Sequence, residues 1–408
     1  MLSEGHLLPY PIAQRAVLGW VAVVIELLWS VLLLTSYAQT HEGQSVQAST
    51  YTQIARLIRS EFDKDNRGGL SVGVLEGGRL AWRRTYGWAN EEGRQRTNDQ
   101  TIYPIASLTK MVTGIMLLQL VERGKIHLAD PVDAYVPEVK QIPNPFPWAP
   151  PITLVQLATM TSGLEANYES PPVSETDPWE KQVLEALPHL EFDYEPGTRR
   201  EYSNVGYSIL GLALSRAAIR PFTEYVQSEI LKPLGMRDTF FSVTPKIESR
   251  IARGYFLGDP NSASSIVQNS ERDFGLPAGG LLSTLGDLAK LMCFQLGGGP
   301  ETVLARKTLE SSFRGIVPSD GDLRYGDGVG FAAVRNADSR LTALGHGGLR
   351  RAGFVASYEF DRSTRTGLIL LTNTSYGHAN YKPLVRQILA LLYPTSSGGT
   401  GTPLTEQH

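Results

Sequence analysis

Strand-like patterns lie on both sides of a long helical block, and this order constrains the fold more than any other feature of the sequence. Residues 70–90 alternate between apolar and polar side chains around a Gly-Gly turn, whereas residues 105–296 mostly carry apolar side chains at helical spacing. Further strand patterns follow at 325–334, 341–344, 353–360 and 366–372. Strands far apart in sequence can share one antiparallel sheet with the helices inserted between them. We therefore expect an α/β fold, more strictly α+β, with a cleft between sheet and helices.

Helical spacing at residues 51–62 and 381–392 predicts an amphipathic helix at either end of the folded part. The final residues are rich in Ser, Gly and Thr, a composition typical of disorder. The predicted organisation is an N-terminal segment (1–38), one folded domain (39–394) and a disordered tail (395–408). Within the domain we expect a sheet subdomain, roughly 50–100 and 320–394, and a helical subdomain, roughly 101–319.

The N-terminal segment has the pattern of an export signal or a single membrane anchor. Residues 16–34 are apolar apart from Glu26 and Ser30, and Arg15 precedes them. A run of about 20 apolar residues would just span a bilayer, but Glu26 at the membrane centre would cost about 2.5–3.5 kcal/mol. Small residues at 36 and 38 suit cleavage by a signal peptidase, which is the favoured alternative. In either case we expect a periplasmic or extracellular domain, with membrane attachment through residues 16–34 if they are retained.

Charge and cysteine content exclude several classes of function. The 38 basic and 41 acidic residues are scattered along the chain, so no field suited to nucleic acid is expected. Cys293 is the only cysteine, which rules out an intrachain disulfide, and its apolar surroundings predict a buried, inert thiol. The seven histidines lack ligand spacing. The sequence therefore predicts no metal and no cofactor.

The first candidate catalytic motif is Ser107-Leu108-Thr109-Lys110, at the start of an apolar helix that ends near Gly124. Residues three apart share a helix face, so Lys110 can reach the Ser107 hydroxyl. A serine needs a base to act as a nucleophile, and a lysine shielded from water loses its proton more readily. Because one Ser-x-x-Lys arises by chance in about 400 residues, a helix-capping serine beside a solvated lysine is the alternative.

The second motif is Tyr202-Ser203-Asn204, the only Tyr-x-Asn in the chain. A phenol can carry the proton of Ser107 to a leaving group, and an amide can orient both Lys110 and a substrate carbonyl. The alternatives are a loop aromatic at Tyr202 and a helix N-cap at Asn204.

The third motif, Gly345-His346-Gly347-Gly348, stands at the end of a predicted short strand. Glycines would let a substrate lie against the strand edge, and the Leu349 backbone N–H would join that of Ser107 as an oxyanion hole. The alternative is a Gly-rich hairpin turn with a solvated histidine. A similar tripeptide, Arg365-Thr366-Gly367, is assigned to an outer turn between two strands.

Together these motifs resemble the signature of the serine β-lactamase and penicillin-binding-protein superfamily. The likeness extends over residues 51–392 and is greatest to the branch that contains class C β-lactamases, D-alanyl-D-alanine carboxypeptidases, D-aminopeptidases and related esterases. It implies a mixed sheet domain with an all-helical domain, acylation of Ser107, and Lys110 and Tyr202 as general base and acid. It further implies substrate binding by Asn204, His346, Gly347, Gly348 and Leu349. Flanking stretches that also match, expected to be scaffold, are 104–106, 128–132, 152–154, 161–164 and 277–284.

The third motif departs from the Lys-Thr-Gly that β-lactamases usually carry. His346-Gly347-Gly348 removes a permanent cation and a hydroxyl that together hold a substrate carboxylate, since an unperturbed histidine is mostly neutral at pH 7. Arg350 or Arg351 would replace the charge, unless they form a solvated turn. We identify no separate carboxylate base, so Tyr202 would activate the deacylating water.

The departure favours an ester or D-amino-acid peptide substrate, a small molecule or peptide, over a β-lactam. A β-lactamase is the alternative within the same class. An alternative of another class is a non-catalytic module that binds cell wall or peptide. The serine, lysine and tyrosine are all intact, which favours an enzyme.

Overall fold

The computed structural model describes residues 48–168, 177–258, 273–313, 317–319, 322–335, 341–350 and 352–392. The chain divides into two units, residues 1–56 and 57–408. Residues 48–62 are helical, as the spacing at 51–62 predicts. The predicted export segment, Arg351 and the predicted tail lie outside the described residues. Within the described ranges, no helix has both the length and the apolarity needed to cross a bilayer.

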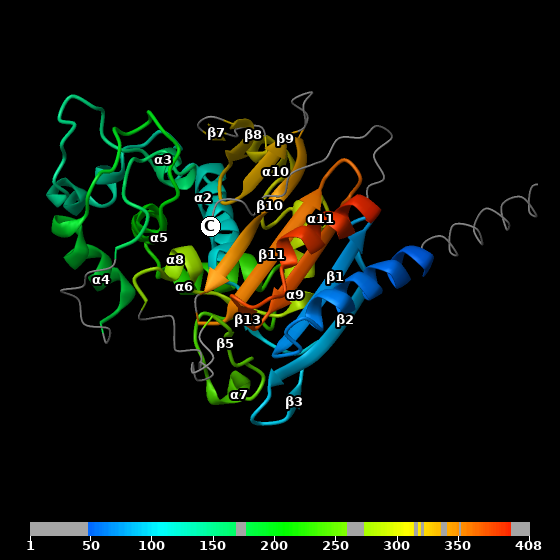
Figure 1. Ribbon diagram of the computed structural model, residues 1–408. Coiled ribbons are helices and arrows are strands. Elements are labelled where there is room, and N and C mark those ends of the chain that lie inside the picture. Colours follow the sequence, from blue (N-terminus) through cyan, green and yellow to red (C-terminus); the bar gives the residue numbers. More distant parts are fainter. Residues whose placement is uncertain are drawn as a thin grey trace, which may run out of the picture. The chain divides into compact units, whose positions relative to one another are not determined.

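The larger unit is built on a nine-stranded sheet with the order β3-β2-β1-β12-β11-β10-β9-β8-β7 (Figure 1). All neighbouring strands are antiparallel. β1 (Gly69–Glu76) lies beside β12 (Thr366–Thr372), with Val72 opposite Leu370. Strands nearly 300 residues apart therefore join in one sheet, as the order of patterns predicts. The other strands are β2 (Arg79–Asn90), β3 (Gln95–Arg96), β7 (Val317–Ser319), β8 (Asp322–Asp327), β9 (Ala332–Arg335), β10 (Leu341–Arg350) and β11 (Phe354–Asp361).

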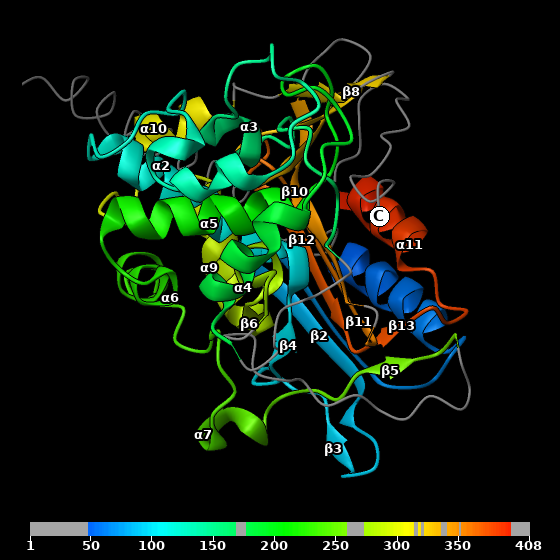
Figure 2. The same cartoon turned by 90° about the vertical axis from the view of Figure 1, so that its left-hand side faces the viewer.

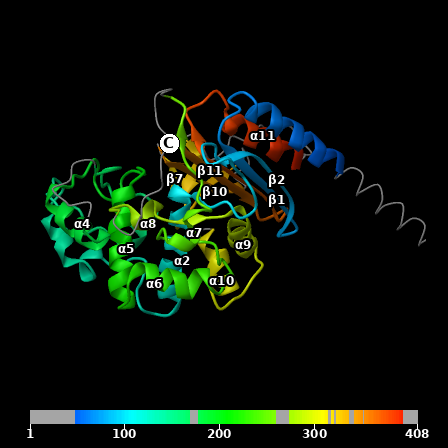
Figure 3. The ribbon, with the colours of Figure 1, turned by 90° about the horizontal axis from the view of Figure 1, so that it is seen from below.

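Helices cover both faces of this sheet (Figure 3). α11 (Tyr381–Leu392) lies on one face, and α9 (Leu285–Gln295) lies on the other against β1 and β12. α2 (Thr109–Glu122) is buried on nearly all sides from Thr109 to Leu120. α5 (Asn204–Ala218) crosses beside α2 on the helical side of the unit (Figure 2). The nucleophile motif is therefore held between the sheet and the helical block.

The helical block and the short strands complete the fold. The helices are α3 (Leu154–Ala158), α4 (Trp179–Ala186), α6 (Phe222–Val226), α7 (Pro245–Glu248), α8 (Leu276–Gly279) and α10 (Arg306–Ser312). Shorter helical turns are η1 (Ala106–Leu108), η2 (Val132–Ala134), η3 (Pro137–Gln141), η4 (Leu187–His189) and η5 (Gln227–Leu231). Two small ladders pair β4 (Tyr103–Pro104) with β6 (Leu282–Ser283), and β5 (Tyr255–Phe256) with β13 (Thr374–Ser375).

The prediction of one strand over residues 325–334 is wrong. The structure has β8 and β9 separated by a turn in which the Gly328 N–H donates to the Phe331 carbonyl at 2.8 Å. Gly330 adopts a left-handed conformation (φ +83°), and any Cβ there would clash with the Lys110 carbonyl. Close packing of this turn against α2 therefore overrides the strand pattern.

Two further predictions need correction. β10 is longer than predicted, so Gly345–Gly348 lie inside a strand rather than at the end of one. Cys293 is partly exposed rather than buried, and its Sγ lies beside the turn at Gly298.

Candidate active site

Ser107 lies on the tight turn η1 that leads directly into α2. The preceding residue, Ala106, has a left-handed backbone (φ +47°), which residues with a Cβ rarely adopt. Two hydrogen bonds hold the turn in place: Thr109 Oγ1 donates to the Ala106 carbonyl (2.7 Å), and the Ile105 N–H donates to the Leu281 carbonyl (3.0 Å). The Ser107 hydroxyl is thus fixed at the N-terminal end of a buried helix, and Ser107 itself is partly exposed.

The Lys110 side chain is completely buried and its amine contacts three oxygens. Nζ donates to Asn204 Oδ1 (2.6 Å) and to the Ala278 carbonyl (3.0 Å), and lies 3.3 Å from Ser107 Oγ. A neutral amine that directs two N–H groups at the first two acceptors has its lone pair left for the Ser107 proton. This arrangement can serve general-base chemistry, and it contradicts the alternative of a solvated lysine.

Tyr202 places its hydroxyl 2.7 Å from Ser107 Oγ. The centre of its ring also lies 4.8 Å from Lys110 Nζ, so the phenol and the amine flank the same serine hydroxyl. Ser203 is the N-cap of α5, with its Oγ accepting from the Gly206 N–H at 2.8 Å, so the alternative of Asn204 as N-cap is wrong. Asn204 instead begins the helix and accepts from Lys110. The first two motifs therefore converge on one oxygen.

The third motif forms a strand edge beside the nucleophile. β9 pairs with β10 only as far as Gly345, opposite Ala332, whereas β11 pairs along β10 to Arg350. Among the described strands, none pairs with the outer edge of residues 346–350. A Cβ on Gly348 would lie 2.5 Å from the Ile105 carbonyl oxygen, so this edge is pressed against the Ser107 turn. A substrate could extend along such an edge by backbone hydrogen bonds.

His346 is buried on this strand, with only 4% of its surface exposed, so the alternative of a solvated histidine in a turn is wrong. Its Nδ1 lies 2.5 Å from the Gly347 carbonyl oxygen. Because a carbonyl only accepts, this contact requires a hydrogen on Nδ1. The centres of the His346 and Tyr202 rings are 6.4 Å apart.

Comparison with known proteins agrees with the resemblance that the three motifs indicate. The β-lactamase family model matches residues 54–392, a span that contains all three motifs. The chain belongs to the β-lactamase family.

Among solved structures, the β-lactamase fold is shared with an octameric penicillin-binding protein homologue from Pyrococcus abyssi. That match has a TM-score of 0.71 at 24% identity and covers 85% of this chain and 78% of the other. A class C β-lactamase in complex with cefoxitin matches with a TM-score of 0.70 at 20% identity, over 84% and 99% of the two chains. At such low identity these neighbours show the fold alone, and they confirm the predicted fold class.

Curated relatives of this β-lactamase family chain include protein flp of Staphylococcus aureus, 29% identical over 246 residues. A human β-lactamase-like protein is 31% identical over 271 residues. The matches cover 60% and 63% of this chain, and 48% and 52% of those proteins. The chain thus spans about half the length of the curated relatives it matches. Family membership supports serine-hydrolase-type chemistry without fixing a substrate.

Sequence reasoning missed two groups at the site. The Ala278 carbonyl, which accepts from Lys110, belongs to a stretch predicted as scaffold. Thr113 Oγ1 fixes that stretch by donating to the Pro277 carbonyl at 2.6 Å. Asn167 Oδ1 accepts from Asn204 Nδ2 at 2.7 Å and so orients the amide. A backbone carbonyl has no side-chain signature, and no motif marks Asn167.

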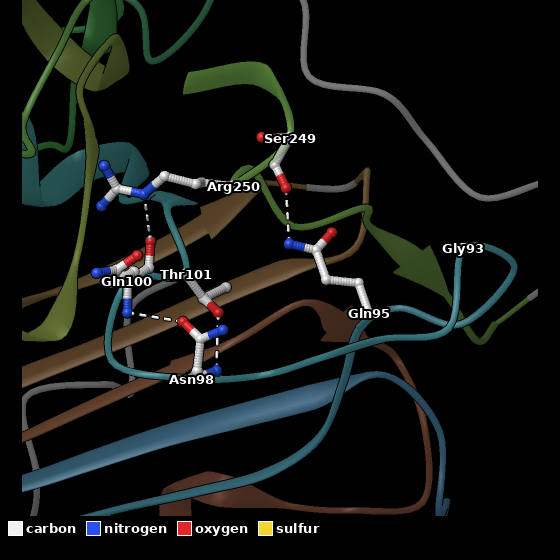
Figure 4. A pocket seen from close by; sticks show the side chains of 7 residues that line it. All are labelled: Gly93, Gln95, Asn98, Gln100, Thr101, Ser249 and Arg250. Carbon is white, nitrogen blue, oxygen red and sulfur yellow. Dashed lines mark hydrogen bonds between the residues drawn. The ribbon is translucent and has the colours of Figure 1, made fainter. Parts of the chain in front are cut away.

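A polar pocket of about 450 Å³ lies apart from the three motifs (Figure 4). Its polar groups bond mostly to one another: Arg250 donates to the Gln100 carbonyl (3.1 Å) and to Asp238 (2.7 Å), and Gln95 donates to the Ser249 carbonyl (2.6 Å). The lining residues are Gly93, Gln95, Asn98, Gln100, Thr101, Ser249 and Arg250. None belongs to a motif, and the contacts fasten a loop to the helical block. In the described part of the chain no cluster of side chains suits a metal ion.

We expect Gly348→Ala to lower hydrolytic activity by about 100-fold or more, because a 1 Å displacement at a catalytic site can have this effect. The added methyl would force the β10 edge away from the Ile105 carbonyl and hence from Ser107. Gly286→Ala is the matched control, since the nearest atom there is 3.9 Å away. Ester hydrolysis and thermal unfolding of both variants check the prediction, and equal activity in the two would refute the close approach.

Proposed function

We propose that this chain is a serine hydrolase that forms a covalent acyl-enzyme on Ser107. One observation carries the proposal: Lys110 Nζ and Tyr202 Oη both lie within 3.3 Å of Ser107 Oγ. A serine hydroxyl with a base and a proton carrier in reach is the arrangement that nucleophilic catalysis requires.

In the acylation step, Ser107 Oγ attacks the substrate carbonyl carbon and its proton passes to Lys110. The negative charge on the carbonyl oxygen is stabilised by the backbone N–H groups of Ser107 and Leu349. The bond to the leaving group then breaks, and Tyr202 delivers a proton to the departing oxygen or nitrogen. In the second step the deprotonated Tyr202 takes a proton from a water molecule, whose oxygen attacks the acyl carbon. The bond from that carbon to Ser107 Oγ breaks, and Lys110 returns its proton to Ser107 Oγ.

The proposed substrate class depends on His346, whose ring lies near that of Tyr202. His346 stands where a permanent cation would hold a substrate carboxylate, and a neutral imidazole supplies no such charge. We therefore propose an ester or a D-amino-acid amide or peptide as substrate, ahead of a β-lactam, with Asn204, His346, Gly347 and Gly348 contacting it. The buried Lys110 and its three oxygen contacts favour this enzyme over a non-catalytic binding module.

The test is a substrate panel of short-chain chromogenic esters, D-amino-acid anilides and a chromogenic cephalosporin. Ser107→Ala serves as the blank, and Ser363→Ala, in an outer turn, as the matched control. We expect esters or anilides to be hydrolysed faster than the cephalosporin, with all turnover lost in Ser107→Ala. A faster cephalosporin would favour the β-lactamase alternative, and turnover that survives in Ser107→Ala would contradict the proposal.

We also propose that the enzyme works outside the cytoplasm, on the pattern of residues 16–34. Cell fractionation with N-terminal sequencing distinguishes the cases. A protein that begins just after Ala38 would show cleavage, and an intact protein in the membrane fraction would show an anchor. An intact cytoplasmic protein would contradict the proposal.

A further inference from the structure

The free edge of β10 continues past the oxyanion position at Leu349 to Arg350. The inference drawn from this edge rests on the proposed function. Tyr202, which would protonate the leaving group, lies near His346, so the leaving group occupies that part of the edge. The oxyanion position at Leu349 comes next along the strand. The acyl part of a substrate must then extend in the opposite direction from Tyr202, toward Arg350.

The side chain of Arg350 lies on the face of β10 that borders the nucleophile. Alternate residues of a strand share a face, so Arg350 is on the same side as Gly348. The Cβ position of Gly348 is directed at Ile105, next to the Ser107 turn. The Arg350 side chain is 31% exposed, so a substrate can reach it.

Within the part of the chain that the structure describes, Arg350 forms a long ion pair with one carboxylate. Its Nη2 lies 3.8 Å from Asp273 Oδ2, and the Asp273 side chain is 47% exposed. The other oxygen of Asp273 accepts from the Gly275 N–H at 2.9 Å, which fixes the turn before α8. A long, exposed ion pair is weak in water. An anionic substrate group can therefore compete for the guanidinium.

Two aromatic residues adjoin Asn167 and Asp273 in the chain, Tyr168 and Phe274. The Tyr168 and Phe274 rings lie 5.8 Å apart and pack against the core. Burial, and secondarily the charge of Glu165, raise the pKa of Tyr168, which keeps its phenol neutral. Asn167, next to Tyr168, bonds Asn204. These contacts connect Asn204, at the Lys110 site, to Asp273 through Asn167 and the two rings, and Arg350 pairs with Asp273.

We propose that Arg350 is a specificity-determining residue that binds a carboxylate at the far end of the acyl group. The enzyme then prefers acyl donors that end in a carboxylate over neutral donors of the same length. The Arg350 charge differs in role from the permanent cation that His346 replaces. Arg350 would bind the acyl group of the substrate, whereas that cation would bind a carboxylate on the leaving-group side.

The test compares two esters with six-carbon acyl chains, 4-nitrophenyl hydrogen adipate and 4-nitrophenyl hexanoate, on the full chain. We expect the wild type to have a higher kcat/KM for the adipate than for the hexanoate. Arg350→Gln should lower this adipate-to-hexanoate ratio of kcat/KM about ten-fold, as for a partly exposed charge-assisted contact. Arg350→Glu should lower it further, and Arg350→Lys should keep part of it. Arg83→Gln is the matched control, since Arg83 also pairs with an exposed aspartate (Asp99, 2.9 Å) and lies outside the site.

The outcomes separate this inference from the proposed function. Suppose that Ser107-dependent hydrolysis of the hexanoate persists and that the adipate-to-hexanoate ratio of kcat/KM is the same in wild type and Arg350→Gln. The inference about Arg350 is then wrong and the proposed function stands. If neither ester shows Ser107-dependent hydrolysis, the proposed function fails and the inference fails with it. A ratio that falls equally in Arg83→Gln would show a general charge effect and would also overturn the inference.

Discussion

Replacing Lys110 with methionine is expected to lower kcat/KM for the best ester or amide substrate by at least about 1,000-fold, since the change removes the base that activates the nucleophile. Methionine fills most of the same space, so the buried site is not emptied. Asn204 Oδ1 and the Ala278 carbonyl lose their donor, however, and the free energy of unfolding should fall as well. Steady-state kinetics and thermal unfolding measure the two effects separately.

Lys290→Met is the matched control for this prediction. Lys290 also pairs with a carboxylate, Asp287, and bonds the Gly235 carbonyl, but it is half exposed and away from Ser107. Its variant should retain wild-type activity. A folded Lys110→Met protein that kept more than a tenth of the activity would exclude Lys110 as the base.

Replacing Tyr202 with phenylalanine is expected to lower turnover by about 100- to 1,000-fold, which is within the usual range for loss of a general acid or base. The ring and its packing are kept, and only the hydroxyl 2.7 Å from Ser107 Oγ is lost. Because Tyr202 would act in both steps, deacylation should slow as well. Intact-mass spectrometry during turnover should then show an acyl group on Ser107 that the wild type does not accumulate.

The control for the tyrosine is Tyr225→Phe. The Tyr225 hydroxyl accepts from Arg123 at 2.9 Å, and its ring lies beside the same guanidinium, so the variant loses a comparable contact outside the site. Turnover in Tyr225→Phe should be unchanged. If Tyr202→Phe turned over as fast as this control, proton transfer would have to run through Lys110 alone.

Much of the fold could be predicted from periodicity. The bounds of β12 and α11 agree with the predicted ranges, and strands from the two ends of the chain pair as expected. The break between β8 and β9 could not be predicted, because it depends on contact between Gly330 and the distant Lys110 backbone. The length of β10 was missed for a related reason. Glycines weaken most strands, but in β10 the glycine at 348 leaves space for the Ser107 turn to pack against the strand.

At the site, the sequence could identify the side chains but not the backbone that positions them. The first two motifs predicted Ser107, Lys110 and Tyr202, and the structure brings these side chains together. The left-handed conformation of Ala106 and the Ala278 carbonyl carry no side-chain signal, since both are properties of the folded main chain. Asn167 was missed because it acts through Asn204 rather than on Ser107.

Covalent labelling tests the central claim most directly. The full chain is exposed to a fluorophosphonate, and its intact mass and peptide map are compared with those of Ser107→Ala and Ser363→Ala. The account predicts a single adduct on Ser107 in the wild type and in Ser363→Ala, and no adduct in Ser107→Ala. A folded wild-type protein that takes up no label, or takes it up at another residue, would contradict an activated Ser107 and favour a non-catalytic binding module.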